Sequence, residues 1–168
     1  KKVVAHVLTF NSEKTIRHCL EALTQQELPK DFELKITLSD NCSSDKTLEV
    51  AREFSAKVQI TEHKTNHGFS KGYNLAIQDA LSSGADYVLA LNPDVALAKD
   101  AITEMLKGFS QDSRVGMCCP KLYRANSSLT AIEPKCFDST GMYITPELRH
   151  FDRGSQELDK GQYEKAQF

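Results

Sequence analysis

Residues 3–10 read VVAHVLTF, a mostly apolar run of the length of a β-strand. Asn11 and Ser12 follow this run and can cap a helix. The next apolar residues fall at i, i+3, i+4 and i+7, on one helical stripe: Ile16, Cys19, Leu20 and Leu23. A strand that leads directly into an amphipathic helix is the first half of a β–α–β unit. This stretch therefore predicts an α/β fold.

The same alternation continues through the first 120 residues. Further strand-like runs lie at residues 34–38, 58–60, 87–91 and 115–119. Helical stripes separate them, and their apolar residues are Leu48, Ala51 and Phe54, then Tyr73, Ala76, Ile77, Ala80 and Leu81, then Ile102, Met105, Leu106 and Phe109. Repeated strand–helix units build a largely parallel sheet, and continuously apolar strands indicate that helices cover both of its faces. We expect a mostly parallel central sheet flanked by helices.

Polar residues follow three of the predicted strands. They lie at residues 9–11 (TFN), 39–41 (SDN) and 92–94 (NPD). In parallel sheets the carboxyl ends of the strands share one edge, and ligands bind beyond that edge. The sequence therefore predicts a binding site built from these three segments.

Each motif at this edge allows a functional and a structural interpretation. Asp94, after a buried strand and a rigid proline, suits a hard cation such as Mg²⁺ or Mn²⁺, but Asn-Pro-Asp is also an ordinary surface turn. Asp40 could hydrogen-bond a nucleobase or ribose, or it could form an Asx turn. The GFSKG run at residues 68–72 could bring helix amides to an anion, or simply begin a helix.

Composition and missing motifs exclude several classes. A net charge of −2 argues against a nucleic-acid partner, and no apolar stretch approaches the ~20 residues of a membrane span. The chain lacks GxGxxG after its first strand, which argues against dinucleotide dehydrogenases. It also lacks GxxxxGK[ST], which argues against P-loop NTPases. The five cysteines show no CxxC spacing and are expected to be free thiols in a reducing cytoplasm. His63 and His67 are interpreted as loop histidines.

The alternation fails after about residue 120. Residues 137–144 could form a strand, and the polar stretch from residue 150 onward is expected to be irregular. We therefore divide the chain into an α/β part, residues 1–120, and a second part, residues 121–168.

Taken together, the motifs resemble the family 2 glycosyltransferases of the GT-A (Rossmann-like) fold, and most of all their rhamnosyltransferase-like branch. That branch shows T-x-N, V-D-N-x-S-x-D-x-T, N-x-G-x-x-x-G-x-N and N-P-D in this order. The corresponding segments are residues 7–12 (VLTFNS), 39–47 (SDNCSSDKT), 66–74 (NHGFSKGYN) and 91–95 (LNPDV). Weaker likenesses follow at residues 137–142, 152–154 and 159–163.

The resemblance implies that residues 1–120 are a nucleotide-sugar-binding α/β subdomain and that residues 121–168 are the incomplete beginning of an acceptor-side region. It also implies a role for each matching residue. The residues implied to bind the nucleotide sugar are Thr9, Phe10, Asn11, Asp40, Asn66, Gly68, Gly72, Asn74, Asn92 and Asp94. Among them Asp40 would hydrogen-bond the base, and Asp94 would be the main protein ligand of Mg²⁺ or Mn²⁺. Diphosphate oxygens and waters would complete the coordination of that cation.

The implied reaction is transfer of a sugar with inversion, from a UDP- or dTDP-linked donor to a glycan or lipid-linked acceptor of a surface polysaccharide. Rhamnose is favoured by the branch alone, and no catalytic base is assigned because family members carry it beyond the point where this chain ends. The chain is expected to be the donor-binding part of a cytoplasmic enzyme, working at the inner face of the membrane if its acceptor is lipid-linked. The alternative is a truncated, non-catalytic module that binds a nucleotide or another protein. A second copy of the chain could be that protein, which would make a homodimer.

Overall fold

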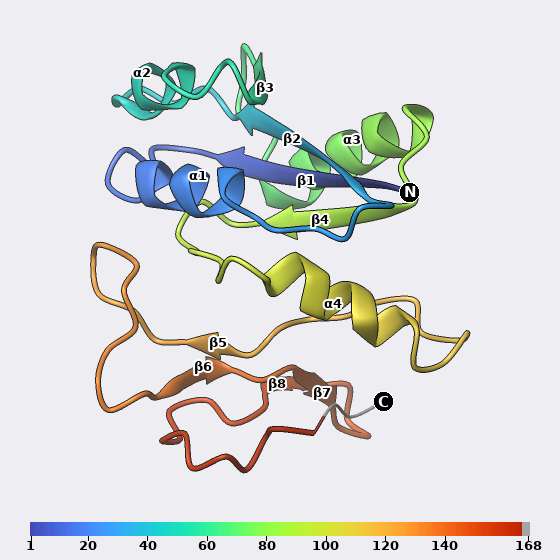
Figure 1. The fold of residues 1–168 in the computed structure, drawn as a ribbon. Coiled ribbons are helices and arrows are strands. Elements are labelled where there is room, and N and C mark those ends of the chain that lie inside the picture. Colours follow the sequence, from blue (N-terminus) through green and yellow to red (C-terminus); the bar gives the residue numbers. More distant parts are fainter. Residues whose placement is uncertain (166–168) are drawn as a thin grey trace. The chain divides into compact units, whose positions relative to one another are not determined.

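The computed structural model describes residues 1–165. The chain divides into two compact units, Lys1–Asp100 and Ala101–Phe168 (Figure 1). This structural division falls before the last predicted helix, whereas the sequence analysis placed a functional boundary after residue 120. That functional division stays a prediction.

The first unit is a four-stranded parallel sheet with helices. Its elements are β1 (Lys2–Thr9), α1 (Ile16–Thr24), β2 (Glu33–Asp40), α2 (Thr47–Arg52), β3 (Val58–Glu62), α3 (Phe69–Ser82) and β4 (Tyr87–Leu91). The strand order is β3-β2-β1-β4, and every neighbouring pair is parallel. The predicted parallel sheet is therefore confirmed for these four strands, and the carboxyl ends of β1, β2 and β4 lie at one edge.

Strand β1 is buried on both faces because it lies inside the sheet between two helical layers. Residues from Val3 to Thr9 are all buried. Figure 1 shows α1 in front of the sheet and α3 behind it. All four apolar residues of the predicted α1 stripe are buried. Burial of an aliphatic side chain such as those of Ile16, Leu20 and Leu23 stabilises a fold by about 1.5–3 kcal/mol. The core thus holds the carboxyl end of β1 in a fixed position.

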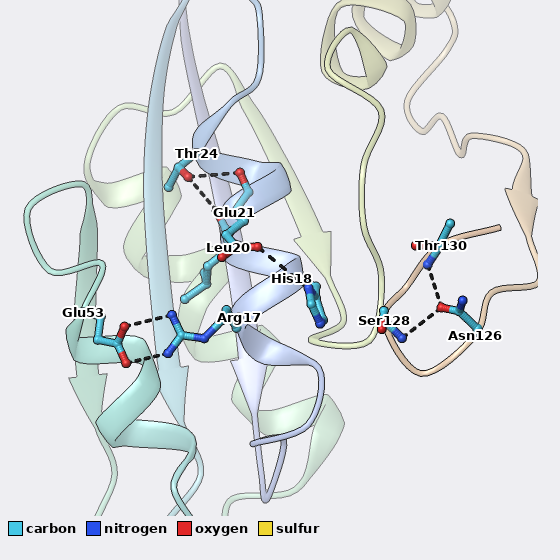
Figure 2. Close-up of polar contacts among 9 residues, drawn as sticks. All are labelled: Arg17, His18, Leu20, Glu21, Thr24, Glu53, Asn126, Ser128 and Thr130. Carbon is cyan, nitrogen blue, oxygen red and sulfur yellow. Dashed lines mark hydrogen bonds and ion pairs between the residues drawn. The ribbon is translucent and has the colours of Figure 1, made fainter.

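The ends of α1 differ from the sequence expectation. Neither Asn11 nor Ser12 caps the helix with its side chain; the Ser12 carbonyl accepts from the amides of Thr15 and Ile16 instead. Farther along α1, Arg17 makes a two-pronged ion pair with Glu53, with nitrogen–oxygen distances of 2.8 and 2.6 Å (Figure 2). Both side chains are solvent-exposed, so this pair orients α1 beside α2 more than it stabilises the fold.

Helix α3 buries Tyr73, Ala76 and Ala80. Leu81, which the sequence analysis placed on the same stripe, is 59% exposed. It lies in the last turn of α3, at the edge of the buried stripe, since successive helical residues are turned by about 100° and Ala80 is the buried one.

His6 is a buried polar residue on the α3 side of β1. Its Nδ1 lies 2.8 Å from the Thr37 hydroxyl oxygen, and its ring meets Tyr73 edge-on. Its Nε2 has no partner within residues 1–165. Burial lowers the pKa of His6 to about 4, against a smaller opposing effect of Asp79 and with a contribution from His63. The imidazole is therefore neutral in the folded state at neutral pH.

This buried histidine should make the fold sensitive to acid. Its pKa lies below the ordinary 6.5, so between pH 6.5 and 4 the unfolded chain binds a proton that the folded chain does not. Stability is therefore lost as the pH falls through this window, by about 2–3 kcal/mol at pH 4.5. Urea unfolding of the wild type and of His6→Gln at pH 7.5 and 4.5 measures this effect. An equal loss in both proteins would contradict it.

The second unit, as far as residue 165, contains one helix and short strands. They are α4 (Ala101–Phe109), β5 (Leu122–Tyr123), β6 (Phe137–Ser139), β7 (Met142–Ile144) and β8 (His150–Asp152). Strands β5 and β6 pair antiparallel, as do β7 and β8. Phe137 is fully buried and packs against the rings of Tyr123 and Tyr163. The loop after β5 is closed by Asn126, whose Oδ1 accepts from the amides of Ser128 and Thr130 (Figure 2).

Three sequence predictions are corrected in this unit. Residues 115–119 were expected to be a fifth strand, but they are irregular, and Met117 is 85% exposed. Residues 137–144 form two strands rather than one, because the chain turns at Gly141, whose φ is 123°. His150–Asp152, expected to be irregular, is a strand because it pairs with β7.

The weakly matching late motifs do pack together. The Arg153 guanidinium donates to the Thr140 hydroxyl and carbonyl oxygens at 3.0 and 2.7 Å and lies over the Tyr163 ring. A Cβ on Gly154 would lie 2.7 Å from that ring, so glycine allows the close approach.

No helix within the described residues is long and apolar enough to cross a membrane.

Candidate functional site

A cavity of about 780 Å³ opens at the carboxyl edge of the sheet in the first unit. Four segments line it: the end of β1 with the loop that follows, the loop after β2, the loop before α3 and the turn after β4. The lining residues are Leu8, Thr9, Phe10, Asn11, Ser12, Glu13, Lys14, Thr15, Asn41, Asp45, Asn66, Gly68, Phe69, Asn92, Pro93 and Asp94. The edge predicted from the three polar strand ends is thus the edge where the cavity lies.

Seven of the ten predicted site residues line this cavity, and three do not. The seven are Thr9, Phe10, Asn11, Asn66, Gly68, Asn92 and Asp94. Asp40, Gly72 and Asn74 lie outside its lining. The structure places these three in other environments, and their ligand-binding roles stay predictions.

Asp40 is completely buried inside the protein. Its Oδ1 accepts from the hydroxyls of Thr9 at 2.8 Å and Ser43 at 2.6 Å, and its Oδ2 accepts from the Ser43 amide at 2.8 Å. Thr9 reaches it because the two residues are register partners at the ends of β1 and β2. The carboxyl group therefore joins the two strand ends. It accepts from the amide three residues on, whereas an Asx turn is closed by the amide two residues on, so the Asx turn of the alternative interpretation is not formed.

The loops after β1 and β2 are fastened to each other by further hydrogen bonds. The Asn11 amide donates to the Ser43 hydroxyl at 2.9 Å, and the Asn11 side-chain oxygen accepts from the Ser44 amide at 2.9 Å. Asn11 has a φ of 50°, a left-handed conformation that asparagine tolerates well. Glu13 and Asp45 repeat this exchange one step along, because the amide of Glu13 donates to Asp45 and Glu13 accepts from Lys46. One wall of the cavity is therefore held in place before any ligand binds.

Gly72 and Asn74 lie in α3. A Cβ on Gly72 would be 2.7 and 2.8 Å from the methyl carbons of Leu8, so this glycine lets α3 pack closely on β1. Asn74 is exposed. On the cavity side, Gly68 precedes α3 with a φ of 74°, and its amide donates to the Asn66 side chain at 2.7 Å. Asn41 links this loop to β2 by donating to the Gly68 carbonyl at 3.1 Å.

The turn after β4 is held by two helices. The Tyr73 hydroxyl of α3 lies 2.9 Å from the Leu91 carbonyl oxygen and 3.2 Å from Oδ1 of Asn92. The Cys19 thiol of α1 donates to the Asn92 carbonyl over 3.7 Å. Burial raises the pKa of Cys19 and of Tyr73 to about 12, and the Asp94 carboxylate adds to both shifts. Both groups therefore stay protonated and able to donate at neutral pH.

The turn after β4 has oxygen atoms that could coordinate a hard cation, provided that a bound ligand supplies most of the oxygens around that cation. Residues 1–165 contain no group of three or more His, Cys, Asp or Glu side chains that could hold a metal. Asp94 brings one carboxylate to the cavity, and magnesium-type cations are commonly held by one or two carboxylates plus substrate phosphates. His63 and His67 lie in a loop, as predicted, with their rings in edge-on contact.

The sequence analysis missed several lining residues. Ser12, Glu13, Lys14 and Thr15 line the cavity because the loop after β1 continues along it, and Lys14 brings a positive charge. Phe69 lines it from the first residue of α3. These residues directly follow the predicted motifs. Following each strand-end loop as far as its helix would have included them.

Comparison with known proteins agrees with this geometry. A family model described as glycosyl transferase family 2 matches residues 5–160. The poly(ribitol-phosphate) β-N-acetylglucosaminyltransferase TarS of Staphylococcus aureus is 31% identical over 101 residues, which are 58% of this chain and 17% of that protein. The uncharacterized glycosyltransferase YfnE of Bacillus subtilis is 29% identical over 111 residues, which are 65% of this chain and 27% of that protein.

Solved structures show the same fold. The crystal structure of S. aureus TarS 1-349 in complex with UDP matches with a TM-score of 0.57 and 27% identity, over 66% of this chain and 32% of that one. The mannosyltransferase PcManGT from Pyrobaculum calidifontis, in complex with GDP-Man and Mn²⁺, matches with a TM-score of 0.61 and 23% identity, over 71% and 35%. The predicted α/β GT-A fold is confirmed. The chain spans about a third or less of the length of its curated relatives.

Proposed function

This chain belongs to glycosyl transferase family 2, and from that premise we propose that its cavity binds a nucleoside-diphosphate sugar whose sugar is transferred to an acceptor hydroxyl. The observation that carries the proposal is the convergence of three polar strand ends on one cavity of about 780 Å³. Such a cavity, at the carboxyl edge of a parallel sheet, is of a size that accommodates small ligands and cofactors.

The proposed reaction is a direct displacement with inversion at the anomeric carbon. A bond forms between the acceptor oxygen and this carbon, while the bond from the carbon to the diphosphate oxygen breaks. A carboxylate base takes the acceptor proton, and no residue of this chain is assigned that role. The chain's own contribution is to hold the donor between the fastened β1 and β2 loops and the rigid turn at Asn92, Pro93 and Asp94.

Asp94 is the residue proposed to hold a divalent cation, Mg²⁺ or Mn²⁺. When bound, such a cation offsets the negative charge that grows on the leaving diphosphate. The Mn²⁺ in the PcManGT complex belongs to a protein of the same fold. The role of Asp94 in this chain rests on its place in the cavity and on the match of residues 91–95 to the family motif.

The proposed donor carries a pyrimidine base, either as UDP or as dTDP. TarS, which has 27% sequence identity to this chain over the matched part of its structure, was crystallised with UDP. A dTDP-linked rhamnose is the finer proposal, and it rests on the resemblance of the motifs to the rhamnosyltransferase-like branch. The proposed acceptor is a glycan or lipid-linked polymer of the cell surface, reached from the cytoplasmic side. The name of TarS gives poly(ribitol-phosphate), a polymer, as its acceptor. A polymeric acceptor for this chain agrees with that name.

Titration calorimetry with UDP, dTDP and GDP, each with and without Mn²⁺, tests the proposal. We expect a pyrimidine nucleotide to bind with a dissociation constant on the order of 10–100 μM in the presence of Mn²⁺. GDP is the matched control for the base. Failure of both pyrimidine nucleotides to bind would contradict the proposal and favour the non-catalytic interaction module.

A further inference from the structure

The side chain of Asn92 is attached on one side only. Tyr73 is buried in α3, and its hydroxyl lies 3.2 Å from Oδ1 of Asn92 while also reaching the Leu91 carbonyl oxygen at 2.9 Å. Asn92 itself is exposed and lines the cavity. An asparagine amide has one oxygen and one NH₂ group, and the oxygen is the end that contacts Tyr73.

Tyr73 comes from the segment at residues 66–74 that the sequence analysis singled out, yet it received no role there. Its ring is fixed by edge-on contacts with His6 and Phe69, whose ring centroids lie 6.0 and 4.8 Å from its own. A side chain locked by packing can hold a hydrogen-bond partner in one orientation at little entropic cost.

We infer that Tyr73 is a positioning residue that occupies the oxygen of Asn92 and so leaves the Asn92 NH₂ group to donate a hydrogen bond to an acceptor oxygen of the bound nucleotide. The inference rests on the proposed function, since it assigns a task within the same cavity. It gives Asn92 and Asp94 opposite chemistry. Asn92 is a donor to the nucleotide that needs no cation, whereas Asp94 is an acceptor that contacts the diphosphate only through one.

This division of roles gives a measurable signature. Loss of the Asn92 donor weakens nucleotide binding equally with and without Mn²⁺, so the increment due to the metal is unchanged. Loss of the Asp94 charge removes that increment and does not weaken metal-free binding. If Tyr73 acts only through Asn92, removing its hydroxyl has no effect once the amide is absent.

The experiment is a double-mutant cycle with Tyr73→Phe, Asn92→Ala and the double variant. The affinity for the pyrimidine nucleotide that the wild type binds is measured by calorimetry with and without Mn²⁺. Thr24→Val is the matched control, because it also removes a hydroxyl that donates to a backbone carbonyl, that of Leu20 at 2.8 Å, but Thr24 does not line the donor cavity. Urea unfolding of each variant reports its stability.

We expect Tyr73→Phe to weaken binding about 3- to 10-fold at both metal conditions. We expect no further weakening when it is added to Asn92→Ala, and no change for Thr24→Val. Full affinity in Tyr73→Phe would overturn the inference. So would an effect that persists in the Asn92→Ala background, because that pattern indicates general loss of structure.

If Tyr73→Phe does not fold, Asn92→Asp decides the matter. It keeps an oxygen for the Tyr73 hydroxyl but has no N–H, so binding measured without Mn²⁺ should weaken at least as much as in Asn92→Ala. Unchanged metal-free binding would overturn the inference. A wild type that binds no pyrimidine nucleotide would refute the proposed function, and this inference with it. That result differs from a wild type that binds and a Tyr73→Phe variant that binds equally well.

Discussion

Asp40→Ala is expected to lower the free energy of unfolding by about 3–5 kcal/mol, because buried hydrogen-bond donors left without an acceptor cost about 1–3 kcal/mol each. Three donors lose their acceptor at once: the Thr9 hydroxyl and both the amide and the hydroxyl of Ser43. The Thr9 hydroxyl keeps only a long contact of 3.4 Å to the Ser39 carbonyl oxygen. Urea unfolding measures the loss.

Two comparisons make this test sharper. Asp40→Asn keeps the shape and one acceptor oxygen but turns an NH₂ group toward one of the donors, so we expect a smaller loss than for alanine. Asp31→Ala removes an exposed carboxylate in the loop before β2 and should leave stability nearly unchanged. If Asp40→Ala were as stable as the wild type while its nucleotide affinity fell, Asp40 would contact the base rather than join the strand ends.

Asp94→Asn is expected to abolish the increase in nucleotide affinity that Mn²⁺ produces in the wild type. In the wild type, Mn²⁺ should raise nucleotide affinity roughly 10- to 100-fold. This is about the effect of one hydrogen bond to a charged group, which we take as the scale for one contact through the cation. Carboxylate and diphosphate repel each other unless a cation lies between them. The neutral amide keeps the shape but is a weak ligand for a hard cation. It also no longer repels the diphosphate, so metal-free affinity should not fall.

The readout is the ratio of the nucleotide dissociation constants measured without and with Mn²⁺. Asn92→Ala is the matched control in the same turn, and its ratio should equal that of the wild type. A full metal increment in Asp94→Asn would show that Asn92-Pro93-Asp94 is an ordinary turn without a metal ligand.

The sheet could be predicted because its strands carry their own signal. Residues 3–10 are mostly apolar and residues 87–91 are apolar throughout, and each run is followed by residues that end a strand. Residues 115–119 are equally apolar but pair with no strand of the described chain. A strand requires a hydrogen-bonding neighbour, and the composition of a segment does not reveal whether one exists.

The site could be predicted to the edge of the sheet but not to each side chain. Parallel strands bring Thr9, Asp40 and Asn92 to one edge whatever the details. Whether a side chain then faces the cavity or a neighbouring strand depends on register, and the pairing of Thr9 with Asp40 turns the carboxyl group inward. The packing role of Gly72 could not be predicted for a similar reason. It depends on the Leu8 methyl groups of β1, which lie close to Gly72 in space but far from it in the sequence.

The most direct test of the central claim is a crystal structure of this chain with UDP and Mn²⁺, in which the anomalous signal of manganese locates the cation. The account predicts manganese within coordination distance of an Asp94 carboxylate oxygen and of the diphosphate, with the nucleotide lying along the loops at residues 9–11 and 66–68. Nucleotide bound at another face of the first unit, or manganese held by residues other than Asp94, would contradict it.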